Sequence, residues 1–524
     1  TTSGLLTASA GQYLRNRNSG KILANSMDLS GQHLLNESAI QATLKGDLDF
    51  SALIDNDSTL ILSTSASGSK STLQAPIFTN AGTMQSVKDM DIVLKNSGTF
   101  TNSAGAKVKV TTSGLEIRSG AAGGTSSVNN SGRMEAGNGI DILGYDSGSN
   151  INLTVGATSG DDGVLKSSDV RIKGNTVNNS GTIETDSDNG ALDIDVATFN
   201  NNGAGSLLIN SGTNWSDLTV TGTVKNEGAI YGKGNFTISA GNLSNSATAG
   251  IFSNANLTMS TGSNFDNFGA LYSGGNLSLT ATGKMVTNKP GATIDSDGSM
   301  TLSAATFTNY SDINAANNIT INTTTAFNNL VQISGGTLTE EAITYAPMTK
   351  AEFEDASAYV GDNADSTYWS PGGGVAYEFY AFDGTRTDCT MTDGNSCAYF
   401  NRDDRVWAVT TPVADNTDAT NPHNWAVYQY YHRIYEDDDF WSDDEFTHYY
   451  GMIRGQKKTI KKNVISAGAT VTKSKIAAGG TLAINLGSGS GTNKGSILSA
   501  NTVTINGSGS FTNDALTPVT ETYY

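Results

Sequence analysis

The chain contains 524 residues, of which 59 are Gly and only 7 are Pro, and 15% of its residues are charged. Such low Pro and charge contents argue against a disordered chain, which carries more of both. The net charge of −19 argues against nucleic acid and anionic membranes as partners, because those ligands need clustered Lys and Arg. No run of 18 apolar residues is present, so membrane insertion is not expected. Because residues 1–4 read like the middle of a repeat, we expect the chain to be a piece of a longer protein.

From residue 1 to about 336 the sequence repeats with a period of about 20 residues, which indicates a solenoid. Each repeat starts with an apolar residue two positions before an Asn, continues with a second apolar segment and ends with an apolar-x-apolar pair. The clearest run is Val224-x-Asn226, Leu243-x-Asn245, Phe265-x-Asn267, Val286-x-Asn288, Phe307-x-Asn309 and Phe327-x-Asn329. Its Asn residues follow one another at steps of 19, 22, 21, 21 and 20 residues.

This periodicity predicts an all-β fold, a right-handed parallel β-helix of roughly sixteen coils over residues 1–336. Coils about 4.8 Å apart would stack Phe265, Val286, Phe307 and Phe327 into one apolar column. Gly at the turns is expected to supply positive φ angles. The recurring Asn is expected to tolerate the same geometry and to hydrogen-bond the next coil through its amide. We therefore interpret these Asn as structural rather than as ligand sites.

Between about Gly336 and Lys462 the repeat vanishes and the composition changes. Residues 345–453 hold 22 of the 41 aromatic residues and 20 acids against 5 bases. A loop of this length and aromatic content predicts a folded domain. We expect a stalk over 1–336, an inserted aromatic, acidic domain of mixed α/β structure over 337–463, and a return to β-helix coils with the start of a next region over 464–524. Within the insertion, a helix is expected at 350–359 and strands at 375–382 and 405–410.

The strongest candidate for a binding site is an acidic and aromatic run in the insertion. Tyr and Trp dominate binding hot spots, and interleaved carboxylates attract a basic partner. The alternative is that the aromatic residues form the core of the inserted domain and the acids form its solvated face. The predicted receptor-binding residues are Tyr428, Tyr430, Tyr431, Tyr435, Asp437, Asp438, Asp439, Phe440, Trp441, Asp443, Asp444 and Glu445.

Other chemistry has weaker signals. Cys389 and Cys397 lie eight residues apart, which suits either a disulfide-closed loop in an exported protein or two free thiols. His432 and Glu436 would form a metal pair only on a helix, and no metal is expected. Along the repeats the acids are scattered at turns, no nucleophile or cofactor motif is present, and neither an enzyme nor a cofactor is expected. The tight acidic pairs are Asp186/Asp188 and Asp295/Asp297.

Two repeats carry a family resemblance, Asn130-Ser-Gly132…Ile140-Asp-Ile142 and Asn179-Ser-Gly181…Leu192-Asp-Ile194. They resemble the filamentous haemagglutinin repeats of bacterial two-partner-secretion exoproteins, over residues 1 to about 335 and about 480–516. The interruption by an aromatic domain is similar to the contact-dependent growth inhibition effectors, the CdiA family. That resemblance implies a stalk plus a receptor-binding region, with the toxin elsewhere in the full protein.

The resemblance also implies location and partners. The chain is expected to be secreted through the outer-membrane transporter of its two-partner system and displayed on the bacterial surface. Its expected partner is an outer-membrane protein or lipopolysaccharide of a neighbouring bacterium. Two alternatives are a host-directed adhesin of the same secretion class, which would bind glycan or host protein, and a β-helix enzyme that cleaves polysaccharide.

Overall fold

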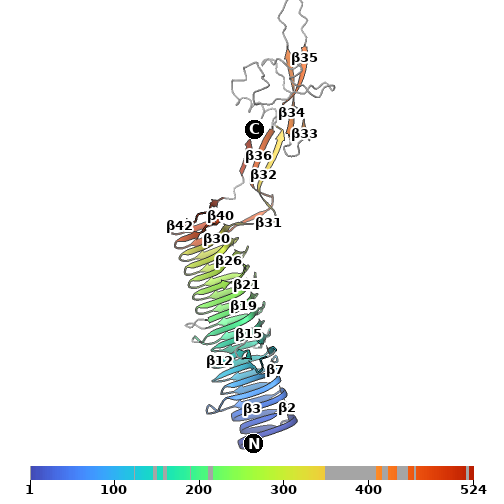
Figure 1. Cartoon of the computed structure of the whole chain (residues 1–524), viewed down its shortest axis with the longest axis vertical. Coiled ribbons are helices and arrows are strands. Elements are labelled where there is room, and N and C mark those ends of the chain that lie inside the picture. The colour runs from blue at the N-terminus through green and yellow to red at the C-terminus, as the bar shows by residue number, and fades with distance from the viewer. Residues whose placement is uncertain are drawn as a thin grey trace, which may run out of the picture. The chain divides into compact units, whose positions relative to one another are not determined.

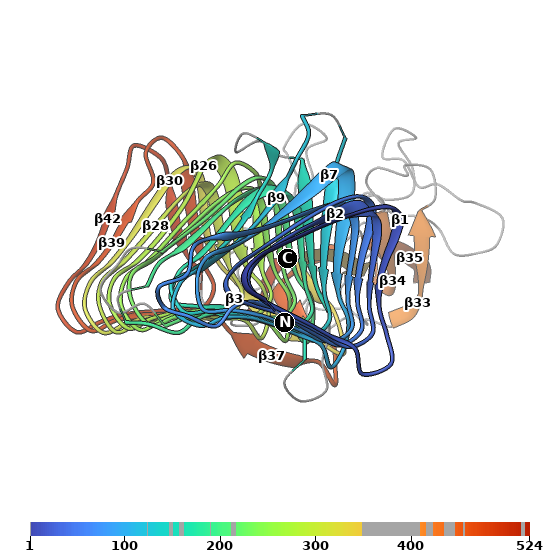
Figure 2. The same cartoon turned by 90° about the horizontal axis from the view of Figure 1, so that it is seen from below.

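The computed structural model describes residues 2–122, 124–145, 150–156, 162–188, 190–210, 216–347, 409–415, 423–433, 446–453, 456–514 and 519–523. These residues divide into two units, one comprising residues 1–332 and 471–515 and the other comprising residues 333–470 and 516–524. No α-helix occurs in the described ranges. The first unit is a parallel β-solenoid of about 17 turns, in which the coils overlie one another around a shared interior (Figures 1 and 2).

Each coil has three faces, which follow the three parts of the sequence repeat. Face A carries the apolar-x-Asn segment, face B a strand of about four residues, and face C the apolar-x-apolar pair. Many strands run without a break from face C into face A, and the first three of them begin on face B. These long strands are β1 (Thr2–Asn16), β2 (Lys21–Asn36), β3 (Ala39–Asn56), β5 (Ser71–Asn80), β7 (Met90–Asn102), β15 (Val170–Asn179), β17 (Leu192–Asn201), β19 (Ser216–Asn226), β21 (Phe236–Asn245), β26 (Leu277–Asn288), β28 (Met300–Asn309) and β30 (Ile319–Asn329).

In the other coils faces A and C are separate strands, and from β4 (Thr59–Ser63) onward face B is a separate strand in coils of both kinds. Face A is formed by β10 (Ser126–Asn130), β13 (Ile151–Val155), β24 (Phe265–Asn267), β40 (Ser490–Asn493) and β43 (Phe511–Asn513). Face C is formed by β9 (Gly114–Ser119), β12 (Gly139–Leu143), β23 (Leu257–Thr261), β39 (Leu482–Asn485) and β42 (Val503–Asn506). Face B is formed by β4 (Thr59–Ser63), β6 (Thr83–Ser86), β8 (Lys107–Val110), β11 (Arg133–Ala136), β14 (Val164–Ser167), β16 (Thr182–Thr185), β18 (Ser206–Ile209), β20 (Ala229–Gly232), β22 (Gly250–Ser253), β25 (Ala270–Ser273), β27 (Thr293–Ser296), β29 (Asp312–Ala315), β38 (Lys475–Ala478) and β41 (Ser496–Ser499).

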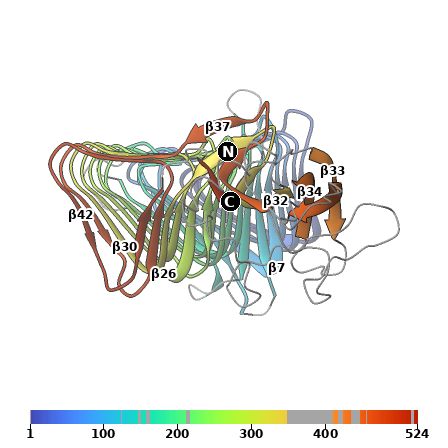
Figure 3. The same cartoon turned by 90° about the horizontal axis from the view of Figure 1, so that it is seen from above.

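The interior consists of apolar columns, because each strand pairs in parallel with the equivalent strand of the next coil. On face A, Phe265 stacks on Val286, which stacks on Phe307 and then on Phe327. All four side chains are at most 1% exposed. The column predicted from the sequence period is therefore confirmed. At the C-terminal end of the stack β39 pairs with β30 and β42 pairs with β39. Figure 3 shows β30 and β42 at this end.

One position of this column is occupied by Gly491, which pairs with Phe327 on one side and Phe511 on the other. The two rings stack across the gap with their centroids 6.4 Å apart. A Cβ atom on residue 491 would come within 2.4 Å of the Phe511 ring. The ring of the following coil thus fills the space that an aromatic side chain at 491 would occupy.

The recurring asparagines form a second column, as predicted. The side-chain Nδ2 of each donates to Oδ1 of the next, for example from Asn226 to Asn245 at 2.9 Å and from Asn245 to Asn267 at 2.9 Å. The ladder residues from Asn16 to Asn493 are buried in extended strands, and none has a positive φ. The expected left-handed geometry is therefore wrong for these Asn, whereas the expected amide bond between coils is confirmed.

The ladder is broken at one coil. Val155 stands between Asn130 and Asn179 in the register. Because Val offers no amide donor, the Oδ1 of the fully buried Asn179 has no hydrogen-bond partner. Among the described buried side-chain atoms the other one without a partner is Oγ of Ser167, which nothing in the structure explains.

The Gly that follows the Asn has a different role from the one expected. Gly228 and Gly269 do not have positive φ angles. A Cβ on Gly228 would lie 2.1 Å from the carbonyl oxygen of Gly205 on the preceding coil, and one on Gly269 would lie 2.2 Å from that of Ala249. Gly is thus required by the close approach of two coils at the corner between faces A and B. The expected positive φ does occur at other turns, such as Gly105 and Gly291.

Candidate functional site

The solenoid is interrupted inside one turn, between Asn329 on face A and Lys475 on face B. β38 pairs with β29, and β39 and β40 pair with β30, so the coil closes as if the chain had continued directly. The asparagine ladder also crosses the interruption, because Asn329 Nδ2 donates to Asn493 Oδ1 at 2.7 Å. The coils that resume after the interruption therefore keep the register of the coils before it.

The corner at the interruption has the same two-residue geometry as its neighbour. In the preceding coil Tyr310 and Ser311 connect the two faces. Leu330 donates its backbone N–H to Asn309, as Tyr310 does to Asn288. The backbone of Ser474 accepts from the next coil as that of Ser311 does. Residues 331–473 are thus an excursion out of a single corner.

The described part of the excursion consists of β-strands. β31 (Val331–Ser334) pairs with β37 (Thr470–Lys473). β36 (Gln456–Ile465) pairs antiparallel with β32 (Leu338–Pro347) and with β44 (Val519–Tyr523). β34 (His423–Arg433) lies between β33 (Val409–Asp415) and β35 (Phe446–Ile453) in a three-stranded antiparallel sheet.

Three of the predicted receptor-binding residues lie on β34. The register places Tyr428 opposite Val409 and Gly451, Tyr430 opposite Tyr449, and Tyr431 opposite His448. The other predicted residues belong to the segment that connects β34 to β35 and lie outside the described residues. They are Tyr435, Asp437, Asp438, Asp439, Phe440, Trp441, Asp443, Asp444 and Glu445.

Several other predictions also fall outside the described residues. Cys389 and Cys397, the helix at 350–359 and the strand at 375–382 belong to this group, and the strand predicted at 405–410 overlaps β33 only at its last two residues. His432 lies within the strand β34, and Glu436 lies outside the described residues. No group of three potential metal ligands is found in the part of the chain that the structure describes.

The structure brings together acids that the sequence reading left scattered. Asp91, Glu116 and Asp141 occupy the middle of the apolar-x-apolar pairs on three successive coils of face C, and Arg171 and Asp193 continue this row. They point outward because the residues on either side of them are buried. We call these five residues the acidic row; it lines a groove of about 450 Å³.

Burial and ion pairs set the charge of the acidic row. Lys70 lies 2.5 Å from Asp91, and Arg171 lies 3.1 Å from Asp141. The hydrogen bond to Asp91 raises the pKa of Lys70. Burial raises the pKa of Glu116, and the nearby charge of Asp91 adds to it. Burial also raises the pKa of Asp141, against the opposing effect of Arg171.

The sequence contains a signal for the acidic row that the sequence pattern alone did not single out. The signal is a charged residue between two core residues, as in Leu115-Glu116-Ile117 and Ile140-Asp141-Ile142. Residues of the two acidic pairs that the sequence analysis singled out instead have partners on other coils. Asp188 pairs with Lys233, Asp295 accepts from Asn314, and Asp297 accepts from Tyr272.

The comparison with known families agrees with the fold. A model of the haemagglutinin repeat matches residues 1–69, 59–104, 229–289, 284–342 and 477–517, just under half of the chain. The chain carries haemagglutinin repeats. Coils of the same geometry as these haemagglutinin repeats continue through the described part of the unmatched residues 105–228. No curated protein and no solved structure matches the chain significantly.

Haemagglutinin repeats in a β-solenoid fit secreted surface filaments and adhesins of the two-partner-secretion type. The described excursion, residues 331–347 and 409–473 with their gaps, falls largely between the matched stretches. Among the residues that the structure describes, no helix is long and apolar enough to cross a membrane.

Proposed function

We propose that this chain is the distal stalk and receptor-recognition region of a contact-dependent growth inhibition effector displayed on the bacterial surface. The haemagglutinin-repeat solenoid holds the recognition region away from the surface of the producing cell. Residues 337–463 recognise an outer-membrane protein or lipopolysaccharide of a neighbouring bacterium, and the toxin is carried elsewhere in the full protein. The chain itself is not an enzyme, and it leaves the producing cell through the outer-membrane transporter of its secretion pair.

The observation that carries this proposal is the looping of residues 331–473 out of one corner of a stack that stays in register. Asn329 still bonds to Asn493 at 2.7 Å, so the coils do not depend on the inserted sequence for their alignment. The insertion can therefore change its recognition surface without loss of the stalk. Its composition favours binding, because aromatic residues dominate hot spots and the net −15 of residues 345–453 attracts basic partners.

The experiment is a cell-binding assay with the fluorescently labelled 524-residue chain. The cells are a set of bacterial strains that each lack one outer-membrane protein, strains with truncated lipopolysaccharide, and cultured host cells. We expect binding to bacteria, and loss of that binding in one strain of the set. Equal binding to every bacterial strain together with strong binding to host cells would contradict the proposal and support a host-directed adhesin.

A further inference from the structure

Both of the buried polar atoms without a hydrogen-bond partner among the described side chains lie in or next to one coil of the solenoid. This coil is formed by β12, β13 and β14, and we call it the Val155 coil. Oγ of Ser167 belongs to the coil itself, at the end of β14. Oδ1 of Asn179 belongs to the next coil, where Asn179 lies opposite Val155 in the register. Two defects in the buried hydrogen bonds thus meet at a single coil.

These unpaired atoms weaken the attachment of the Val155 coil to its neighbours. A polar atom that is buried without a partner carries a desolvation cost that a paired atom avoids. Because Val has no amide, the coil neither accepts from Asn130 of the preceding coil nor donates to Asn179 of the following one. Asn130 keeps its bond to the backbone oxygen of Val164, 2.8 Å away. The amide-to-amide bonds that join the other coils are therefore missing on both sides of this coil.

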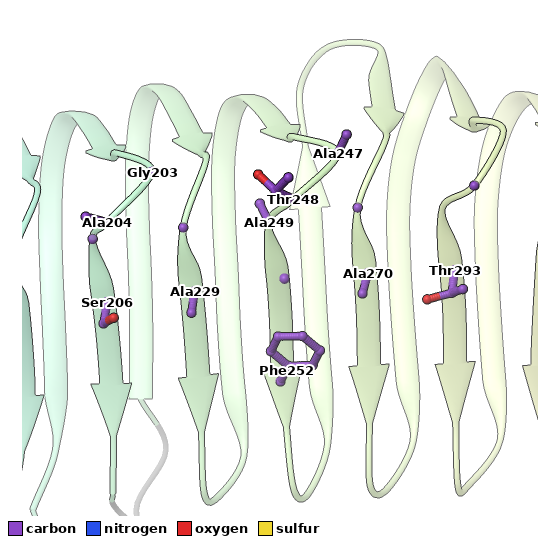
Figure 4. Close-up of a pocket in the computed structure, with 15 residues that line it drawn as sticks. Gly203, Ala204, Ser206, Ala229, Ala247, Thr248, Ala249, Phe252, Ala270 and Thr293 are labelled. Atoms are coloured by element: carbon purple, nitrogen blue, oxygen red, sulfur yellow. The ribbon is translucent and has the colours of Figure 1, made fainter.

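Later coils show what the Val155 coil lacks. From β20 to β27 the amide ladder on face A has no gap. On face B, Ser273 occupies the position equivalent to Ser167, and its Oγ donates to the backbone of Ala255 on the preceding coil at 2.7 Å. Figure 4 shows strands of this region around a groove of about 550 Å³, with Ala270 and Thr293 at the same position of their coils. These coils serve as the internal reference.

Polar side-chain contacts on the outside of the solenoid connect the Val155 coil to the following coil. They are Asp141–Arg171 at 3.1 Å, Lys166–Glu184 at 2.8 Å and Asn175–Asn152 at 3.0 Å. The first two are ion pairs between side chains that are 20–45% exposed. Ion pairs at such exposure contribute little to stability and weaken as salt screens them. Burial also raises the pKa of Asp141 despite Arg171, so this charge is not fully compensated.

We propose that the interior of the solenoid opens first at the Val155 coil, which makes this coil a built-in point of release in the stalk. The free energy of a solenoid is close to a sum of terms for single coils and for neighbouring pairs, so opening starts where these terms are smallest. The coils before β12 and those after β16 then each keep their own stacked core. A stalk under tension lengthens at one place and does not lose its whole fold. This inference concerns the solenoid alone and is independent of the recognition proposed for residues 337–463.

The test is hydrogen exchange of the whole chain, followed by mass spectrometry and expressed relative to the intrinsic exchange rate of each peptide. We expect the backbone amides of β13 and β14 to exchange about tenfold faster than those of β24 and β25, the effect of one buried unpaired group. A rise in NaCl from about 0.05 M to about 0.5 M should speed exchange in β13 and β14 by a further factor of about three, with a smaller change in β24 and β25.

Ser167→Ala and Ser273→Ala form a matched pair of variants. Ser167→Ala removes a hydroxyl without a partner, so exchange in β14 should slow, whereas Ser273→Ala removes a bonded hydroxyl and should speed exchange in β25. Lys166→Gln removes one outer ion pair and should bring exchange in β14 at low salt close to its high-salt rate. Equal exchange of β13 and β14 with β24 and β25 in the parent chain, or faster exchange in β14 of the Ser167→Ala variant, would overturn the proposal.

Discussion

At the residue scale, the stability of the solenoid depends on the row of buried amide groups on face A. Each Asn is both donor and acceptor, so the loss of one member leaves polar atoms of its two neighbours unpaired. Asn267, for example, accepts from Asn245 and donates to Asn288. The sequence predicted the row, because the apolar-x-Asn spacing repeats. The break at Val155 was hidden by the longer, irregular loops around it.

Val155→Asn should stabilise the chain. The new amide would donate to Asn179 Oδ1, which is buried without a partner, and would accept from Asn130. We expect a gain of roughly 1 kcal/mol, the value of a typical net hydrogen bond. Hydrogen exchange of the backbone amides in β13 and β15 measures this gain in stability. Leu153→Asn, two residues earlier on the same inward face, should destabilise the same coils, and a Val155→Asn chain that exchanges faster than the parent would contradict the account.

The acidic row predicts a dependence of stability on pH. Burial raises the pKa of Glu116 above its ordinary value of 4.5. The folded state therefore binds this proton more tightly than the unfolded state. The contribution of Glu116 to stability is fully present below about pH 4.5 and is lost as pH rises through the higher folded pKa. Glu116→Gln removes this half-buried charge and should raise the melting temperature at pH 7. The difference should shrink toward zero near pH 4.

Glu135→Gln is the matched control for this titration. Glu135 also occupies an outward strand position, but it lies between Lys109 and Lys166 on the neighbouring coils. Removal of its charge should leave the melting temperature unchanged or lower it slightly at pH 7. If Glu116→Gln behaves like Glu135→Gln at every pH, the partial burial of Glu116 does not destabilise its charge.

At the scale of the strands, the period of the sequence was sufficient to predict the three faces and the Phe column. Every coil repeats the same inward positions, so one register error would have moved a whole column outward. The close approach at Gly228 and the alignment of Asp91 with Glu116 could not be predicted in this way. Both depend on which residues of two coils, about 25 positions apart, lie side by side.

Phe307→Asp tests the coupling between coils. Phe307 is 1% exposed and packs in the column between Val286 and Phe327. A charge in this apolar column has no partner, so we expect a loss of several kcal/mol and local unfolding of the coils around it. Thr308→Asp, on the adjacent outward position, should leave the fold intact. Limited proteolysis reports the difference, and equal resistance of the two variants would show that the register is wrong.

At the scale of the whole molecule, the chain combines a repetitive stalk with one non-repetitive insertion. The composition already separated them, because residues 337–463 carry net −12 of the total −19. The composition could not show where in the coil the insertion begins and ends. That depends on which strands of the solenoid pair with each other before and after the inserted residues. The structure assigns it to the corner between Leu330 and Ser474.

The excision of residues 331–473 tests the central claim most directly. Joining Leu330 to Ser474 restores a two-residue corner like that formed by Tyr310 and Ser311. The measurement is binding of this variant to the bacteria that bind the parent chain, with its thermal unfolding recorded by circular dichroism. The account predicts a folded solenoid with a melting temperature close to that of the parent and no binding to those cells. A folded variant that binds as the parent does would contradict it.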